Sequence, residues 1–137
     1  YEFFAFYSNR LLIGHYTMWG SNMALTRKQW RNVRGTVHLR TDIHEDLDLA
    51  MHLHDAGVRI VYDRSIRTNA RLKRVRTERG KLWEYLQWWP RALRLHHRPG
   101  WLAAWAISAG VFYGGSYLMV IADWFARHLF GRSALPD

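Results

Sequence analysis

The sequence of 137 residues predicts part of an α/β domain, followed by an amphipathic interfacial helix and a transmembrane helix. Three observations lead to this fold class. A helical pattern over residues 41–57 ends in glycine and leads directly into β-branched residues, as in α/β units. Tryptophan and arginine interleave over residues 79–100, and residues 101–122 carry no charge. We therefore divide the chain into residues 1–78, 79–100 and 101–137.

The first part contains one ambiguous segment and one clear helix. The opening "YEFFAFY" is apolar and aromatic enough for a strand or for a short helix. Further along, Asp42 and Glu45 have the spacing of a capping box at a helix start. Thr41 or His44 is an equally good N-cap for this helix. We expect Gly57 to end the helix in the left-handed conformation and "VRIVYD" to follow as a strand.

A basic run follows in residues 64–81, where eight basic residues accompany a single acidic one in a chain of net charge +9. Such a run is a solvated surface, a nucleic-acid site or a surface for anionic lipid. Nucleic acid is disfavoured as a partner, because no base-reading or stacking module is visible. The next segment interleaves four tryptophans (Trp83, Trp88, Trp89, Trp101) with three arginines (Arg91, Arg94, Arg98). This composition favours a helix lying among lipid headgroups, which Pro90 is expected to break or restart.

The uncharged stretch of twenty-two residues, 101–122, predicts a membrane span. As a helix it would be about 33 Å long, enough to cross a hydrocarbon core of about 30 Å. A buried core helix, or two short re-entrant segments broken at Gly114 and Gly115, are the alternatives. Basic residues are in excess before the span, so we expect an inner-membrane protein with residues 1–98 facing the cytoplasm. The chain has no cysteine, which excludes disulfides and thiolate metal sites.

Four acidic residues gather in the predicted helix: Glu45, Asp46, Asp48 and Asp55. Three interpretations of this cluster compete. Carboxylates in a first turn stabilise a helix through its dipole and need no other role. "HEDLD" lacks the second histidine of the H-E-x-x-H zinc motif, although four possible ligands lie three or four apart (His44, Glu45, Asp48, His52). Asp46 is also a candidate general base, since neighbouring carboxylates would raise its pKa. The spacing alone does not decide among these three interpretations, of which a zinc site is the least favoured.

Two stretches together resemble the C-terminal half of membrane-bound family 2 glycosyltransferases, which include cellulose and hyaluronan synthases. They are "GSNMALTR", residues 20–27, and "HEDLDLAMHLHDAGVRIVY", residues 44–62. The family has the same order of a G-x-N motif, an E-D-x-D motif, a helix ending in A-G, a strand, interfacial helices and spans. The resemblance covers residues 14–65 by motif and 79–122 by architecture. It implies the acceptor-side part of a GT-A-type nucleotide-sugar transferase fold.

The resemblance also implies roles for individual residues. Asp46 corresponds to the general base for the acceptor hydroxyl and Glu45 to its acidic partner, while Gly20, Ser21 and Asn22 form a loop near donor sugar and acceptor. The implied reaction transfers a sugar from a nucleotide-sugar donor to a lipid-linked or glycan acceptor by direct displacement with inversion. A divalent metal, Mg or Mn, would stabilise the leaving diphosphate. Its ligands belong to the family's N-terminal half, which has no counterpart here, so this chain alone is expected to be inactive.

The sequence departs from the processive members of the family on the interfacial helix. Their Q-x-x-R-W motif is replaced by Gln87-Trp88-Trp89-Pro90-Arg91, in which arginine comes one place late. Trp88, Trp89 and Arg91 are therefore at best degenerate counterparts of the family's substrate-binding residues, and addition of one or a few sugars is favoured over polymer synthesis. The alternative function is a non-catalytic, membrane-anchored basic module that binds anionic lipid.

Overall fold

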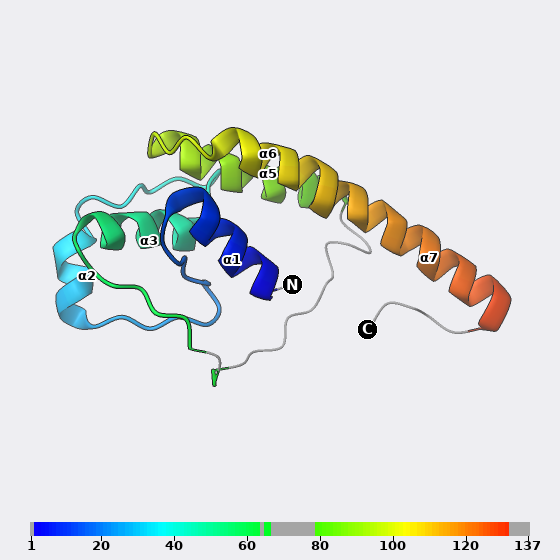
Figure 1. The fold of residues 1–137 in the computed structure, drawn as a ribbon, viewed down its shortest axis with the longest axis horizontal. Helices are drawn as coiled ribbons and strands as arrows, with labels where there is room; N and C mark the ends of the chain where they lie inside the picture. The colour runs from blue at the N-terminus through cyan, green and yellow to red at the C-terminus, as the bar shows by residue number, and fades with distance from the viewer. Residues whose placement is uncertain (1, 64, 67–78, 132–137) are drawn as a thin grey trace.

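The computed structural model describes residues 2–63, 65–66 and 79–131, and all the regular structure in them is helical. Figure 1 shows a compact end, where the shorter helices gather, and one long helix that projects from it. The elements of the compact end are α1 (Glu2–Ile13), α2 (Arg27–Val33), α3 (Glu45–Asp55) and α5 (Arg79–Leu95). The long helix is formed by α6 (Trp101–Ile107), the π-helical turns η1 (Ser108–Gly114) and α7 (Gly115–Phe130).

The predicted α/β fold is wrong for the described residues, because they contain no strand. The segment after Gly57 does alternate as a strand would. Val58 and Ile60 pack on a small core with Leu53, whereas Val61 is 69% exposed. No neighbouring described segment offers a ladder of backbone hydrogen bonds, and a strand exists only where such a ladder forms. The segment thus has the alternating burial of a strand but lacks the pairing that defines one.

Helix α3 ends where the sequence predicts. Gly57 has a φ of 75°, its N–H donates to the His54 carbonyl, and the Val58 N–H donates to the Leu53 carbonyl. These two bonds make a Schellman motif. The predicted capping box at the other end does not form, since His44 is the N-cap. Asp42 instead accepts two hydrogen bonds from Arg40, both 2.8 Å long, which lower the pKa of the Asp42 carboxyl.

The main core lies where α3, α5 and α6 meet, and α1 covers it. Residues 2–7 of "YEFFAFY" belong to α1, so of the two alternatives for this segment the helix is correct. The buried residues of this core come from all three helices and the loop before α3 (Ile43, Leu47, Met51, Trp89, Ala92, Leu93, Ala104). Leu12 and Ile13 of α1 pack against their edge. The core therefore joins the segment that carries the acidic cluster to the segment that leads into the long helix.

Helix α5 does not break at Pro90, contrary to the prediction. Pro90 lies inside the helix and is buried. A proline at this position has no N–H for the Leu86 carbonyl, one turn earlier. That carbonyl instead accepts a hydrogen bond from the Ser108 hydroxyl of η1. A packed neighbour thus replaces the missing helical bond, and α5 continues to Leu95.

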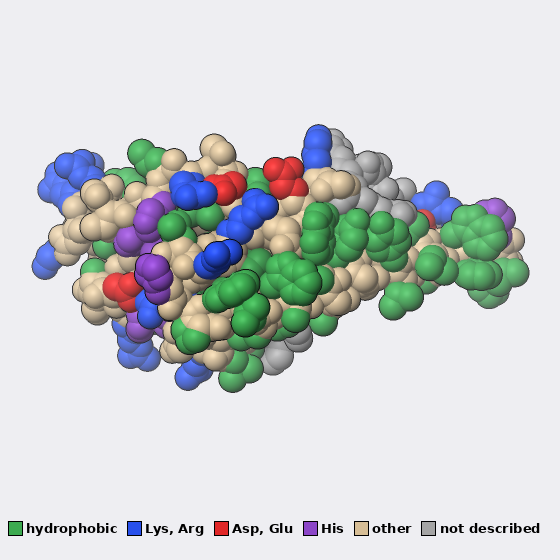
Figure 2. Space-filling model, turned by 90° about the horizontal axis from the view of Figure 1, so that it is seen from above, with side chains coloured by type: hydrophobic (Ala, Val, Ile, Leu, Met, Phe, Trp, Pro, Cys, Tyr) green, Lys and Arg blue, Asp and Glu red, His purple; other side chains and the backbone are tan. Residues whose placement is uncertain are grey.

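The long helix, Trp101–Phe130, is long and apolar enough to cross a membrane, by length and composition. Only 17% of its apolar window is buried, which argues against the buried core helix considered above. It also runs without interruption through Gly114 and Gly115, so the re-entrant alternative is not observed. Figure 2 shows apolar side chains covering the projecting part, while lysine and arginine gather mainly at the compact end.

Two predicted features fall largely or wholly outside the described residues. Of the basic run 64–81, only residues 65–66 and 79–81 are described. The C-terminal tail after Gly131 is likewise outside them.

Candidate functional site

Asp46 lies in the first turn of α3 and holds the loop of the glycine–asparagine motif. Its Oδ2 accepts a hydrogen bond of 2.8 Å from the Gly20 N–H, and its Oδ1 accepts one of 2.8 Å from the Leu47 N–H. The two motifs noted in the sequence, 26 residues apart, are therefore in direct contact. A carboxylate offers about four lone-pair positions, so both oxygens of Asp46 can still accept a bond from a further donor.

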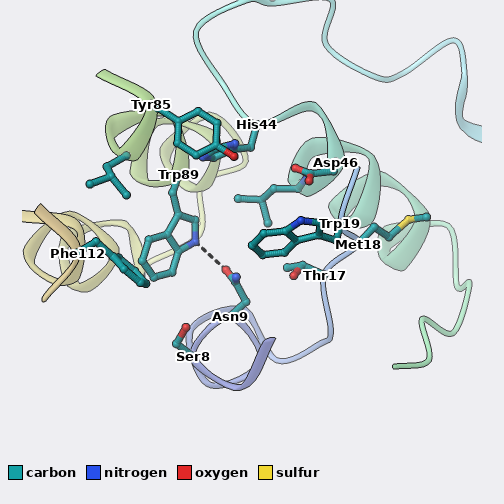
Figure 3. Close-up of a pocket in the computed structure, with 12 residues that line it drawn as sticks. Ser8, Asn9, Thr17, Met18, Trp19, His44, Asp46, Tyr85, Trp89 and Phe112 are labelled. Carbon is teal, nitrogen blue, oxygen red and sulfur yellow. Dashed lines mark hydrogen bonds between the residues drawn. The ribbon is translucent and has the colours of Figure 1, made fainter. Parts of the chain in front are cut away.

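The Asp46 carboxylate borders a cavity of about 80 Å³ between α1, α3, α5 and η1. Figure 3 shows Asp46 on the opposite side of this cavity from Trp89 and Phe112, with Trp19 lining the space between. Tyr85 adds a further ring to the lining. The site thus combines one acidic group with several flat aromatic surfaces.

A buried hydrogen bond holds Trp89, one of the aromatic side chains that line the cavity, in place. The Trp89 Nε1–H donates to Asn9 Oδ1 of α1 over 2.7 Å, and both side chains line the cavity (Figure 3). An indole N–H in a core needs such a partner, because an unpaired buried donor is costly. Of the two neighbouring tryptophans named from the degenerate motif, Trp89 lines the cavity, whereas Asn9 was not predicted as a site residue. Nothing in the spacing of α1 and α5 indicated their pairing, since 80 residues separate them.

A larger cavity, of about 430 Å³, lies on the other side of the Thr17–Trp19 segment. Thr17, Met18 and Trp19 line both cavities. Asn22 lines the larger one, and its Nδ2 donates to the Ile66 carbonyl over 3.4 Å. The loop that follows Trp19 therefore passes from the Asp46 carboxylate to the rim of a second space.

The structure brings together some of the predicted site residues. Gly20 contacts Asp46, and a Cβ placed on Gly20 would lie 3.6 Å from the Glu45 carboxylate, so Glu45 is also close. Ser21 is exposed beside them. Asn22 belongs to the neighbouring cavity, as described above.

The other two residues taken from the degenerate motif on α5, Trp88 and Arg91, lie elsewhere. Trp88 is half-buried, with its ring centroid 5.7 Å from that of His44, and it does not line the Asp46 cavity. Arg91 is exposed and lines a separate groove of about 380 Å³ with Arg40 and Asp42. Because neighbouring helical positions point about 100° apart, Trp89 faces the cavity and Trp88 does not.

A second cluster of polar side chains surrounds Asp48, on another face of α3. Asp48 Oδ1 lies 2.7 Å from His38 Nδ1, 2.7 Å from His96 Nε2 and 3.7 Å from His52 Nε2. His38 also donates its backbone N–H to Asp48 Oδ2 over 2.9 Å. Of the zinc ligands considered from the sequence, Asp48 and His52 belong to this cluster and His44 and Glu45 do not. His38 and His96 were missed, because they come from other segments.

Burial and hydrogen bonding act on this cluster in opposite directions. Burial alone would raise the pKa of the Asp48 carboxyl, but the hydrogen bonds from His96 and His38 outweigh it and lower that pKa. Burial lowers the pKa of His52, and the nearby His96 and His38 lower it further, whereas the Asp48 carboxylate raises it. The net effect is a lowered pKa. Asp48 is therefore ionised and His52 neutral at pH 7.

Comparisons with protein-family models, with curated proteins and with solved structures find no match for this chain. The functional interpretation therefore depends on the two motifs, their contact and the cavity beside them.

Proposed function

We propose that this chain is the acceptor-side part of a membrane-bound glycosyltransferase that uses Asp46 as its general base. The donor is a nucleotide sugar, and the acceptor is a hydroxyl of a lipid-linked or glycan molecule. The observation that carries the proposal is the hydrogen bond between Gly20 and Asp46, which joins the two motifs at the rim of an aromatic cavity. The proposal concerns the chemistry of this site and does not include the α/β fold.

The proposed step is a direct displacement with inversion. The acceptor oxygen forms a bond to the anomeric carbon, while the bond from that carbon to the diphosphate breaks. Asp46 takes the proton of the acceptor hydroxyl as its oxygen attacks, which makes the oxygen a stronger nucleophile. The two backbone N–H groups that bond to the Asp46 oxygens hold the carboxylate in place at the border of the cavity.

The membrane helix supports the choice of acceptor. Phe112 of η1 lines the Asp46 cavity, and η1 belongs to the helix that is apolar enough to span a membrane. An acceptor anchored in lipid could therefore present its hydroxyl to Asp46 while its apolar part remains in the bilayer. We place the site on the cytoplasmic face of the inner membrane, following the distribution of basic residues.

The described residues do not fit the Mg or Mn ion that the family resemblance implies. Their one cluster of three or more possible metal ligands contains three imidazoles and a single carboxylate. Mg²⁺ prefers an octahedral set of oxygen ligands, and Mn²⁺ also suits carboxylate and water. We therefore assign no step to such an ion in this part of the protein.

Sugar transfer by membranes that contain the full-length protein tests the proposal. Membranes would be supplied in turn with radiolabelled nucleotide sugars and extracted for labelled lipid and glycan. We expect transfer from one donor class, with inverted anomeric configuration in the product. Membranes from the same host without the protein are the control. Retention of configuration, or no transfer from any nucleotide sugar, would contradict the proposal.

A specific observation also favours the second candidate, a lipid-binding module. The Arg94 guanidinium lies 5.4 Å from the centre of the Trp101 ring, at the start of the exposed apolar helix. This pairing suits a membrane surface, where arginine meets phosphate and tryptophan meets the boundary of the acyl chains. Tight sedimentation with anionic vesicles but not neutral ones, together with no sugar transfer, would favour this candidate.

A further inference from the structure

Three separate segments bring the Asp48 cluster together, and each does so by a definite local structure. Asp48 and His52 lie one turn apart on α3, so their side chains share a face. His38 comes from the loop before α3 and is fixed by its own backbone bond to Asp48. His96 follows the last residue of α5, where the helix ends in a Schellman motif.

That motif determines where His96 points. The His97 N–H donates to the Arg94 carbonyl, and the Arg98 N–H donates to the Leu93 carbonyl. His97 has a φ of 53°, the left-handed conformation that this motif requires at the position after the cap. His96 is therefore the C-cap, and its side chain turns back towards α3, where it is 6% exposed.

Hydrogen bonding within the cluster does not use all of its donors and acceptors. Asp48 Oδ1 receives one N–H from His38 and one from His96. His52 Nε2 lies 3.3 Å from His38 Nδ1, whose hydrogen already points at Asp48. His52 Nε2 therefore has no short hydrogen bond of its own within the cluster, although the His52 side chain is only 15% exposed.

The distances suit a bound metal ion better. The four ligand atoms all lie within 4.8 Å of one another. Bonds of about 2.0–2.2 Å from a tetrahedral ion to nitrogen and oxygen place its ligands about 3.3 Å apart. The separations of 2.7, 3.3 and 3.7 Å lie on both sides of that value. Side-chain movements of less than about 1 Å would therefore bring all four atoms to bonding distance.

We propose that His38, Asp48, His52 and His96 bind one divalent transition-metal ion of the zinc class. Three imidazoles and one carboxylate are the nitrogen-rich set that such ions prefer. Four protein ligands leave no open position on a tetrahedral ion, so the site is structural. The ion would tie α5 and the loop before α3 to α3 itself, and this role is independent of any chemistry at Asp46.

Metal binding by the untagged full-length protein in detergent tests the proposal. The protein is stripped with a chelator, dialysed and titrated with Zn²⁺, and with Co²⁺, whose visible absorption reports tetrahedral coordination. His52→Ala is the main variant, because His52 makes no short bond to Asp48 and the fold should tolerate its loss. His97→Asn is the matched control, since exposed His97 adjoins the cluster outside it and asparagine accepts the left-handed backbone.

We expect the wild type and His97→Asn to bind one ion per chain and to unfold at a higher temperature with Zn²⁺ than without it. His52→Ala should bind more than about 100-fold more weakly, because even outer-shell partners of a metal site are worth about 10–100-fold. Its circular dichroism spectrum should match that of the wild type. The proposal is overturned if the wild type binds no stoichiometric ion, or if His52→Ala and His97→Asn bind with equal affinity.

Discussion

The hydroxyl of Ser108 donates a hydrogen bond of 3.1 Å to the backbone carbonyl of Leu86, and both groups are buried. In an unbroken α-helix this carbonyl would accept the N–H of residue 90. That residue is Pro90, which has no N–H. The π-helical turn that carries Ser108 therefore supplies the donor that α5 lacks, and the bond attaches α5 to the long helix.

Removing the Ser108 hydroxyl should destabilise the protein in a way that depends on Pro90. We expect Ser108→Ala to cost about 1–3 kcal/mol, because the buried Leu86 carbonyl loses its partner. In a Pro90→Ala background the new N–H bonds to Leu86, so the same substitution should cost much less. Chemical unfolding in detergent, followed by tryptophan fluorescence, measures this double-mutant cycle. Ser116→Ala is the control, since buried Ser116 bonds only within its own helix. Equal costs of Ser108→Ala in both backgrounds would refute the explanation.

Gly100 is expected to be essential for the packing of α1 against the start of α6. A Cβ at this position would lie 2.9 Å from the Leu12 carbonyl oxygen and 3.1 Å from the Leu12 Cβ. Gly100→Ala should therefore force the two segments apart and lower the free energy of unfolding by about 1–3 kcal/mol. Gly110→Ala, where an added Cβ meets nothing within 4 Å, should not destabilise the protein. Thermal unfolding of both variants in detergent makes the comparison, and similar losses would contradict it.

Protonation of His15 should lower the stability of the protein in mild acid. Its Nδ1–H donates to the Tyr16 carbonyl over 2.8 Å, and its buried Nε2 has no hydrogen-bond partner among the described residues. Burial lowers the pKa of His15, and neighbouring His54 and Arg98 lower it further, which together outweigh the hydrogen bond to Tyr16 and the Asp55 carboxylate, both of which raise it. The folded pKa is thus below the unfolded value of about 6.5. Stability is fully present above that pH and is lost as the pH falls towards the folded pKa.

The comparison of wild type with His15→Phe isolates this effect, since all other histidines are common to both proteins. The ring of phenylalanine retains the stacking on His54 but cannot bind a proton. Between pH 7 and 5 the wild type should lose stability more steeply, by at most about 1.4 kcal/mol per pH unit for one proton. Unfolding would be measured with chelator present, to remove any bound metal. Parallel curves for the two proteins would show that His15 does not titrate in this way.

Local patterns predicted much of this structure. The span of α3, its stop at Gly57 and the long apolar helix all follow from residues that are neighbours in sequence. The alternating burial after Gly57 was also predictable, but a strand additionally needs a partner, and no local pattern supplies one. The same limit applies to Pro90, which would end a solitary helix and is accommodated here by Ser108.

The site was predictable only in part, for a similar reason. The resemblance implied that the loop of Gly20 and the base Asp46 both serve the acceptor, but no pattern predicted the hydrogen bond between them. Trp89 pairs with Asn9, and His96 with Asp48, through contacts that link distant segments. For the Asp48 cluster, the available signal was the spacing of Asp48 and His52. It indicated two possible metal ligands but neither His38 nor His96.

The chemical role of Asp46 is tested most directly by steady-state and single-turnover sugar transfer with Asp46→Asn in the full-length protein. Asparagine retains an oxygen for the Gly20 N–H but is far too weak a base to accept the acceptor's proton. We predict that kcat falls by about 10²–10⁴-fold, as for loss of a general base, while KM for the acceptor changes by no more than a few-fold. Asp42→Asn, which alters an exposed ion pair, should transfer sugar at the normal rate. A folded Asp46→Asn protein with kcat within a few-fold of wild type would contradict the assignment.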